Sequence, residues 1–206
     1  MHHDSGPPMS ADDALARLIA GNERFRRGES HWSGISDAAR PALVSGQRPF
    51  ATIIGCSDSR VPPELVFDAG LGELFVIRVA GNVVGNEVAG SIQYAGSHLQ
   101  TPVFVVLGHE GCGAVEAALD TRLRGARHKS RIHLLVESIL PGLGEIDDRL
   151  SHSAQLSLAV ERNVRWTVRQ IADSREGRAR LALGDMRIVG GIYEIASGRV
   201  RLLEDA

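Results

Sequence analysis

Three short, continuously apolar runs, at residues 50–55, 73–79 and 102–108, constrain the fold of this chain more than any other feature. Apolar runs of this length without alternation are typical of strands buried on both faces of a sheet. Apolar residues at helical spacing over 86–100 separate the second run from the third, and residues 113–119 can begin another helix. Strands that alternate with helices indicate parallel βαβ units. The sequence therefore predicts an α/β fold with a mostly parallel central sheet flanked by helices.

The N-terminal part of the chain divides into a loose end, a helix and a loop. Residues 1–9 contain two prolines, two histidines and a glycine, and we expect them to be disordered. Ser10, followed three residues later by an aspartate, gives a capping-box-like start to a helix over 10–27. Residues 28–49 are predicted to be a loop with one short helical turn. We expect residues 10–206 to form a single domain.

The C-terminal part adds two helices and a strand pair. Apolar periodicity predicts helices at 132–140 and 154–171, and Pro141 is expected to break them apart. Residues 186–195 and 200–203 form two apolar segments around a tight turn, which favours two antiparallel strands. The last strand is therefore predicted to be an antiparallel edge strand on the parallel sheet.

Composition excludes several classes of protein. The chain has 206 residues, is 43% hydrophobic and carries a formal net charge of −2, so we expect neither nucleic acid nor a membrane surface as a partner. No run reaches the roughly 18 apolar residues of a membrane span, and the first residues lack the pattern of a secretory signal. We therefore expect a cytoplasmic protein, in which the two cysteines are buried, catalytic or metal-bound.

Both cysteines and one histidine follow the predicted strands. Cys56 ends the first strand, while His109 and Cys112 come just after the third. The carboxyl ends of parallel strands form the edge at which α/β sheets place their ligand sites. Two thiolates and one imidazole are a typical zinc set, and three protein ligands leave one position open for chemistry. Taken alone, the two cysteines are better interpreted as small buried hydrophobic residues.

Charged neighbours of Cys56 favour the metal site. The segment 55–62 places Asp58 and Arg60 in one turn with the thiol. Burying such charges is costly unless they are paired, and these two can pair with each other. The segment therefore indicates a functional turn.

Three motifs in this order resemble the β-class carbonic anhydrases. They are C-S-D-S-R-V-P at 56–62, R-V-A-G-N at 78–82 and G-H-E-G-C-G-A-V at 108–115. The resemblance extends over nearly all of the chain beyond its first nine residues. It implies one Zn²⁺ per subunit and the reversible hydration of CO2 to bicarbonate and a proton by zinc-bound hydroxide.

The resemblance also assigns site residues. It implies that Cys56, His109 and Cys112 are the zinc ligands. It allows two roles for Asp58, which either orients the zinc-bound water or occupies the fourth zinc position itself. Arg60 would be the partner that draws Asp58 off the metal.

Four further residues match substrate-binding positions of the family. Gln47 matches a glutamine that donates a hydrogen bond to substrate across a dimer interface, Phe75 and Tyr94 match aromatic residues around the CO2 pocket, and Gly113 matches a glycine whose N–H reaches the substrate. Without the resemblance, the two aromatic residues would be interpreted as core and Gln47 as a polar loop residue.

The resemblance further implies a homodimer or homotetramer in which the helix over 10–27 packs on a neighbouring subunit. The apolar stripe of that helix would equally suit packing on its own chain. Two alternatives to CO2 hydration stay open. One is a carbonyl sulfide or carbon disulfide hydrolase of the same fold, and the other is a catalytically silent zinc or anion-binding protein. The intact pair of Asp58 and Arg60 disfavours the silent protein.

Regulation and proton transfer are less defined. Arg78 and Tyr193 resemble two members of a bicarbonate-binding triad in one branch of the family, but Ile53 stands where that branch has tryptophan. Arg78 could instead form an interface salt bridge. Several histidines could export protons if they lined the cleft, namely His31, His98, His128, His133 and His152.

Overall fold

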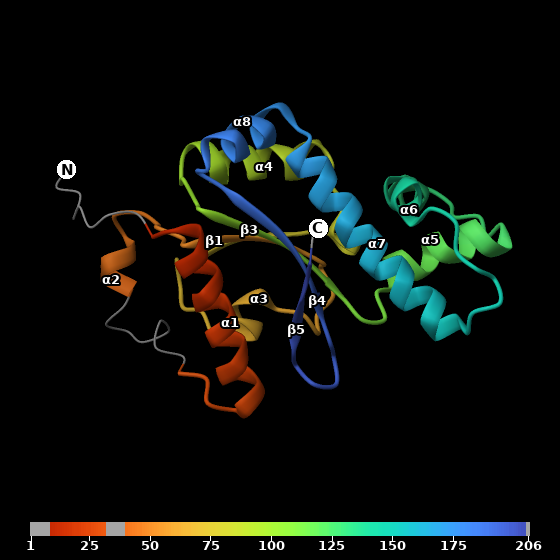
Figure 1. Cartoon of the computed structure of the whole chain (residues 1–206), viewed down its shortest axis with the longest axis horizontal. Coiled ribbons are helices and arrows are strands. Elements are labelled where there is room, and N and C mark those ends of the chain that lie inside the picture. Colours follow the sequence, from red (N-terminus) through yellow and green to blue (C-terminus); the bar gives the residue numbers. More distant parts are fainter. Residues whose placement is uncertain (1–8, 32–39, 205–206) are drawn as a thin grey trace.

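The computed structural model describes residues 9–31 and 40–204, and these form a five-stranded sheet with strand order β2-β1-β3-β4-β5 (Figure 1). The strands are β1 (Ala51–Gly55), β2 (Leu74–Arg78), β3 (Val103–His109), β4 (Arg187–Tyr193) and β5 (Val200–Leu203). The first four are parallel, and β5 pairs antiparallel with β4. The predicted mostly parallel sheet with an antiparallel edge strand is confirmed. Apart from Met9, the segment predicted to be disordered lies outside the described residues.

Helices cover both faces of the sheet (Figure 1). The short helix α2 spans Arg40–Leu43, within the predicted loop. One face carries α1 (Ala11–Arg27) and α3 (Pro63–Val66), and the other carries α4 (Asn86–Ser97), α5 (Gly113–Arg124), α6 (Arg131–Leu143), α7 (His152–Ala172) and α8 (Arg175–Leu183). Alternate residues of the strands point to opposite faces. Thus Ile53 packs in the cluster with α1, whereas Ile54 and Phe104 pack in the cluster with α4 to α7.

Helix α1 packs on its own chain. Its cap is as predicted, because the Ser10 hydroxyl oxygen accepts a hydrogen bond of 3.1 Å from the Asp13 N–H. Leu15 and Leu18 are buried in the cluster formed with α3 and the sheet, while Ile19 is 47% exposed. The packing of α1 on a partner subunit stays a prediction.

Helix α6 continues through Pro141, so the predicted helix end at that residue was wrong. Proline removes one backbone hydrogen bond, but here it lies in the last turn, two residues before the helix ends at Leu143. The Leu140 carbonyl accepts a hydrogen bond of 2.8 Å from the Arg122 Nη2. The loss is therefore local, and a side chain of α5 satisfies one of the free carbonyls at the helix end.

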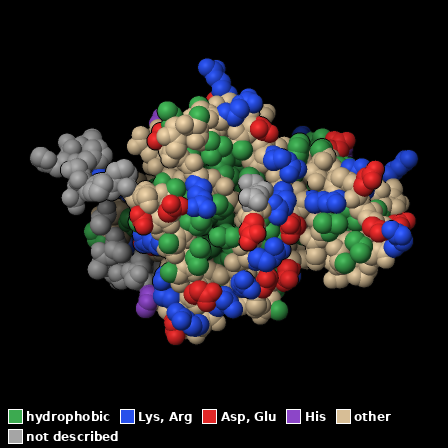
Figure 2. Space-filling model, viewed as in Figure 1, with side chains coloured by type: hydrophobic (Ala, Val, Ile, Leu, Met, Phe, Trp, Pro, Cys, Tyr) green, Lys and Arg blue, Asp and Glu red, His purple; other side chains and the backbone are tan. Residues whose placement is uncertain are grey.

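The surface matches the balanced composition. On the face seen in Figure 2, acidic and basic side chains are interspersed with apolar ones. Within the described ranges, no helix is long and apolar enough to cross a bilayer.

Candidate metal centre

The fold brings Cys56, His109 and Cys112 together at the carboxyl edge of the sheet. β1 and β3 are neighbours in parallel register with Gly55 beside Leu107, so Cys56, the residue after β1, lies within one residue of the level of His109, the last residue of β3. Cys112 is the N-cap of α5, which begins directly after it. One ligand atom from each residue lies within 4.8 Å of the other two, and the Cys56 Sγ and Cys112 Sγ are 3.9 Å apart. All three side chains are buried.

His109 presents an unpaired nitrogen to this cluster. Its Nδ1 lies 2.9 Å from the Glu110 carbonyl oxygen, which accepts a hydrogen bond when Nδ1 carries the proton. Nε2 is then the nitrogen with the free lone pair, and it is buried without a hydrogen-bond partner. A buried polar atom without a partner is unfavourable in a folded protein unless something binds it. The ring is therefore oriented as a metal ligand, with a backbone carbonyl fixing its tautomer.

The pKa values and the spacing of the two cysteines favour binding of a cation. A hydrogen bond with the Cys112 thiol lowers the pKa of Cys56 to about 4, although burial opposes this shift. The same bond, together with burial, raises the pKa of Cys112, so the pair shares one proton. Two sulfur atoms at about 2.3 Å from a tetrahedral zinc ion lie about 3.8 Å apart, which matches the observed separation. The three residues therefore fit one Zn²⁺ per subunit.

Asp58 and Arg60 form a bidentate ion pair beside the cluster. The Arg60 Nε donates to the Asp58 Oδ1 at 2.9 Å, and the Arg60 Nη2 donates to the Asp58 Oδ2 at 2.7 Å. These bonds hold the pKa of the Asp58 carboxyl well below its usual range. The Asp58 Oδ2 lies 3.8 Å from the His109 Nε2, so the carboxylate borders the ligand set while it is bound to Arg60.

Arginine side chains also connect the loops that carry the ligands. The Arg60 Nη2 donates at 3.2 Å to the carbonyl of Gly111, the residue before Cys112. The Arg78 guanidinium donates from Nε to the Cys56 carbonyl at 2.9 Å and from Nη2 to the Asp58 carbonyl at 2.6 Å. Arg78 thus fixes the turn from Cys56 to Asp58 through its backbone, a role that neither sequence interpretation of this residue included.

The predicted substrate-binding residues separate into two groups. Gly113 is the first residue of α5 and directly follows Cys112. Phe75 is paired in register with Thr52, four residues before Cys56, which corresponds to about 13 Å along a strand. The rings of Phe75 and Tyr94 have their centroids 6.0 Å apart, and Tyr94 lines a shallow hollow together with Gln47. Within one subunit, these three residues lie apart from the metal centre.

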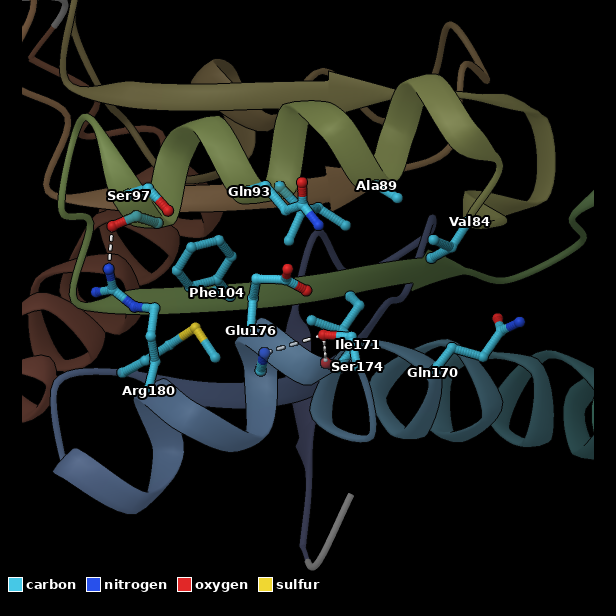
Figure 3. Close-up of a pocket in the computed structure, with 14 residues that line it drawn as sticks. Val84, Ala89, Gln93, Ser97, Phe104, Gln170, Ile171, Ser174, Glu176 and Arg180 are labelled. Carbon is cyan, nitrogen blue, oxygen red and sulfur yellow. Dashed lines mark hydrogen bonds between the residues drawn. The ribbon is translucent and has the colours of Figure 1, made fainter.

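A second, separate hollow lies between α4, α7 and α8 (Figure 3). Its walls are mainly apolar, with Phe104 and Ile171 among the lining residues, and Glu176 and Arg180 of α8 contribute polar groups. None of the residues predicted to be functional lines it.

Comparisons with known proteins agree with this geometry. The family model described as "Carbonic anhydrase" matches residues 51–200. A carbonic anhydrase of Mycolicibacterium smegmatis is 40% identical over 193 residues, which cover 92% of this chain and 91% of the relative. These similarities favour CO2 hydration over the two alternatives.

Solved structures agree on the fold. A Coccomyxa β-carbonic anhydrase in complex with acetazolamide superposes with a TM-score of 0.73 at 27% identity, covering 92% of this chain and 86% of that one. A tetrameric β-carbonic anhydrase of Sordaria macrospora has a TM-score of 0.74 at 23% identity, with 93% and 97% coverage, and supports the fold alone. The ligand geometry, the family match and these similarities lead to one conclusion: the chain belongs to the β-class carbonic anhydrases.

Proposed function

We propose that this carbonic anhydrase hydrates CO2 reversibly at one zinc ion held by Cys56, His109 and Cys112. The observation that carries the proposal is the buried, unpaired Nε2 of His109 beside two sulfur atoms that are 3.9 Å apart. Zinc supplies Lewis acidity there, which lets water act as a nucleophile near neutral pH. Three protein ligands leave the fourth position of a tetrahedral site open for this chemistry.

Asp58 is proposed to orient the attacking water by accepting a hydrogen bond from it. Arg60 keeps the carboxylate ionised and fixes its direction through two parallel hydrogen bonds. The 3.8 Å between the Asp58 Oδ2 and the His109 Nε2 is short enough for a small rotation to bring the carboxylate among the ligands. We assign the arrangement bound to Arg60 to the active enzyme, and the arrangement with Asp58 as fourth ligand to a closed one.

The substrate pocket is proposed to form between two subunits. Gly113 offers its N–H at the start of α5, next to its own metal centre. Phe75 lies in the edge strand β2 with its ring near that of Tyr94, Gln47 lines the same hollow as Tyr94, and 46% of the Tyr94 surface is exposed. These three residues would therefore line the pocket of a partner subunit. On this account a homodimer is the smallest assembly with complete sites, and a homotetramer would contain two such dimers. We also propose a cytoplasmic location.

Stopped-flow CO2 hydration, measured with the zinc content of the same sample, tests the proposal. Activity should follow the zinc content, disappear when a chelator removes the metal and return when zinc is added. Carbonyl sulfide and carbon disulfide hydrolysis should be negligible beside it. A fully zinc-loaded protein that does not hydrate CO2 would overturn the proposed function.

A further inference from the structure

The short segment between β2 and α4 contacts the sulfur of Cys56. The Gly81 N–H donates a hydrogen bond of 3.3 Å to the Cys56 Sγ. Gly81 has a φ of 70° and Asn82 a φ of 45°, so two consecutive residues have the left-handed conformation. That conformation costs free energy for asparagine, and such strain persists only where the surroundings hold it. Some other part of the molecule must therefore fix this segment.

Helix α7 provides the residues that hold it. The Asn163 Nδ2 donates to the Gly81 carbonyl at 2.9 Å, and the Thr167 Oγ1 donates to the Asn82 carbonyl at 3.2 Å. Each of the two side chains is only 1% exposed. They are four residues apart, so they lie one above the other on a single face of α7.

Close packing fixes the position of this face of α7. A Cβ atom built at Gly108, the residue before His109, would lie 2.5 Å from the Val164 Cγ2. At Gly81, a Cβ atom would lie 2.8 Å from the Ile139 Cδ1. Neither the end of β3 nor the Gly81 segment has room to move toward its neighbours. The two hydrogen bonds from α7 hold the carbonyls of Gly81 and Asn82, and the close packing of this segment keeps those carbonyls within reach of α7.

We propose that Asn163 and Thr167 are positioning residues of the metal centre, which keep the Gly81 N–H directed at the Cys56 sulfur. A hydrogen bond to a thiolate sulfur withdraws charge from it and orients its lone pairs, and outer partners of this kind tune metal affinity. The inference rests on the proposed role of Cys56 as a zinc ligand and goes beyond it, because it makes two residues of a distant helix part of the site.

Substitutions at these two positions can distinguish a positioning role at the metal centre from a general contribution to the stability of the fold. Thr167→Val replaces the hydroxyl donor by a methyl group of similar size, and Asn163→Leu replaces the amide donor by a larger apolar side chain with the same number of heavy atoms, whereas Thr167→Ser keeps the hydroxyl. Gln155→Leu is the control on the same helix. Gln155 is 4% exposed, and its Nε2 donates at 3.2 Å to the carbonyl of Asp147, outside the metal centre. The control thus loses a similar buried bond without affecting the Gly81 segment.

Two measurements on the full chain test the proposal: the rate of zinc release to a chelator, and the sulfur-to-metal charge-transfer band of the cobalt-substituted protein. We expect Thr167→Val and Asn163→Leu to release zinc about 10-fold faster and to shift the band. Thr167→Ser and Gln155→Leu should match the wild type in both measurements.

The proposal is overturned if Thr167→Val leaves the band in place and releases zinc no faster than Gln155→Leu. If Asn163→Leu fails to fold, the comparison of Thr167→Val with Thr167→Ser is sufficient to test the proposal. A wild type that binds no zinc would contradict the proposed function itself, whereas a zinc-loaded wild type with unaltered variants would contradict only this inference.

Discussion

The metal centre and the hollow between α4, α7 and α8 differ in what their polar groups do. At the metal centre, three ligand atoms lie within 4.8 Å of one another and the His109 Nε2 has no hydrogen-bond partner. Of the polar groups at the hollow, the Arg180 Nη1 and Nη2 donate to the carbonyls of Gly96 and Asp185, and only the Arg180 Nε is buried without a partner among the arginine nitrogens. Convergent ligand atoms, rather than empty space, therefore identify the functional site of this protein.

Cys112→Ala should have the largest effect, because it removes one of only three ligands. We expect the variant to lose both its zinc and its CO2 hydration activity, which elemental analysis and stopped-flow kinetics would measure. Full zinc content in the variant would show that the ligand assignment is wrong. The metal centre would then no longer be distinguished from the hollow by its ligand atoms.

Asp58→Asn should lower the rate of CO2 hydration about 100-fold while zinc is retained, because the amide is neutral, places an NH2 donor where the carboxylate has a second acceptor oxygen, and cannot keep both hydrogen bonds from Arg60. The chain offers a matched control in Asp147, which forms the same bidentate pair with Arg149, at 2.9 and 2.8 Å, on the surface. Asp147→Asn should leave the rate unchanged. Equal rates in the two variants would refute a catalytic role for Asp58.

The pH profile should show the effect of two thiolate ligands. Thiolates offset the positive charge of the metal, so they stabilise bound hydroxide less than three histidines do, for which the water pKa is about 7. We therefore expect the activity to rise as the pH increases through values above 7 and to fall about tenfold per unit on the acidic side. Activity that is already constant from mildly acidic pH upward would contradict this argument.

Filling the hollow should have the smallest effect. Ala89→Leu would place a larger apolar side chain among the residues that line it (Figure 3), and CO2 hydration should stay at the wild-type rate. A tenfold lower rate with zinc retained would show that the hollow takes part in catalysis. The metal centre would then not be the only functional site of the two.

Local patterns predicted the elements that carry the metal ligands. The strands β1 and β3 could be predicted because all their residues are buried. Burial on both faces leaves an unbroken apolar run in the sequence. Helix α8 escaped prediction because Gly177 is its only buried residue, so it has no apolar stripe. Its Ser174 and Gly184 caps were the available signals.

The supporting residues of the site could not be predicted in the same way. Asn163 and Thr167 bond to residues that are 82 and 85 positions away in the sequence. In a helical pattern, polar residues are taken to face solvent, and only the tertiary structure shows that these two are buried. The separation of Gln47, Phe75 and Tyr94 from the metal centre likewise depends on strand register.

X-ray absorption at the zinc edge of the purified wild type tests the central claim most directly. The proposed ligands predict two sulfur atoms at about 2.3 Å and lighter atoms at about 2.0 to 2.1 Å around one zinc ion per chain. A zinc environment without sulfur, or with only one sulfur atom, would contradict the assignment of Cys56 and Cys112 and the mechanism based on it.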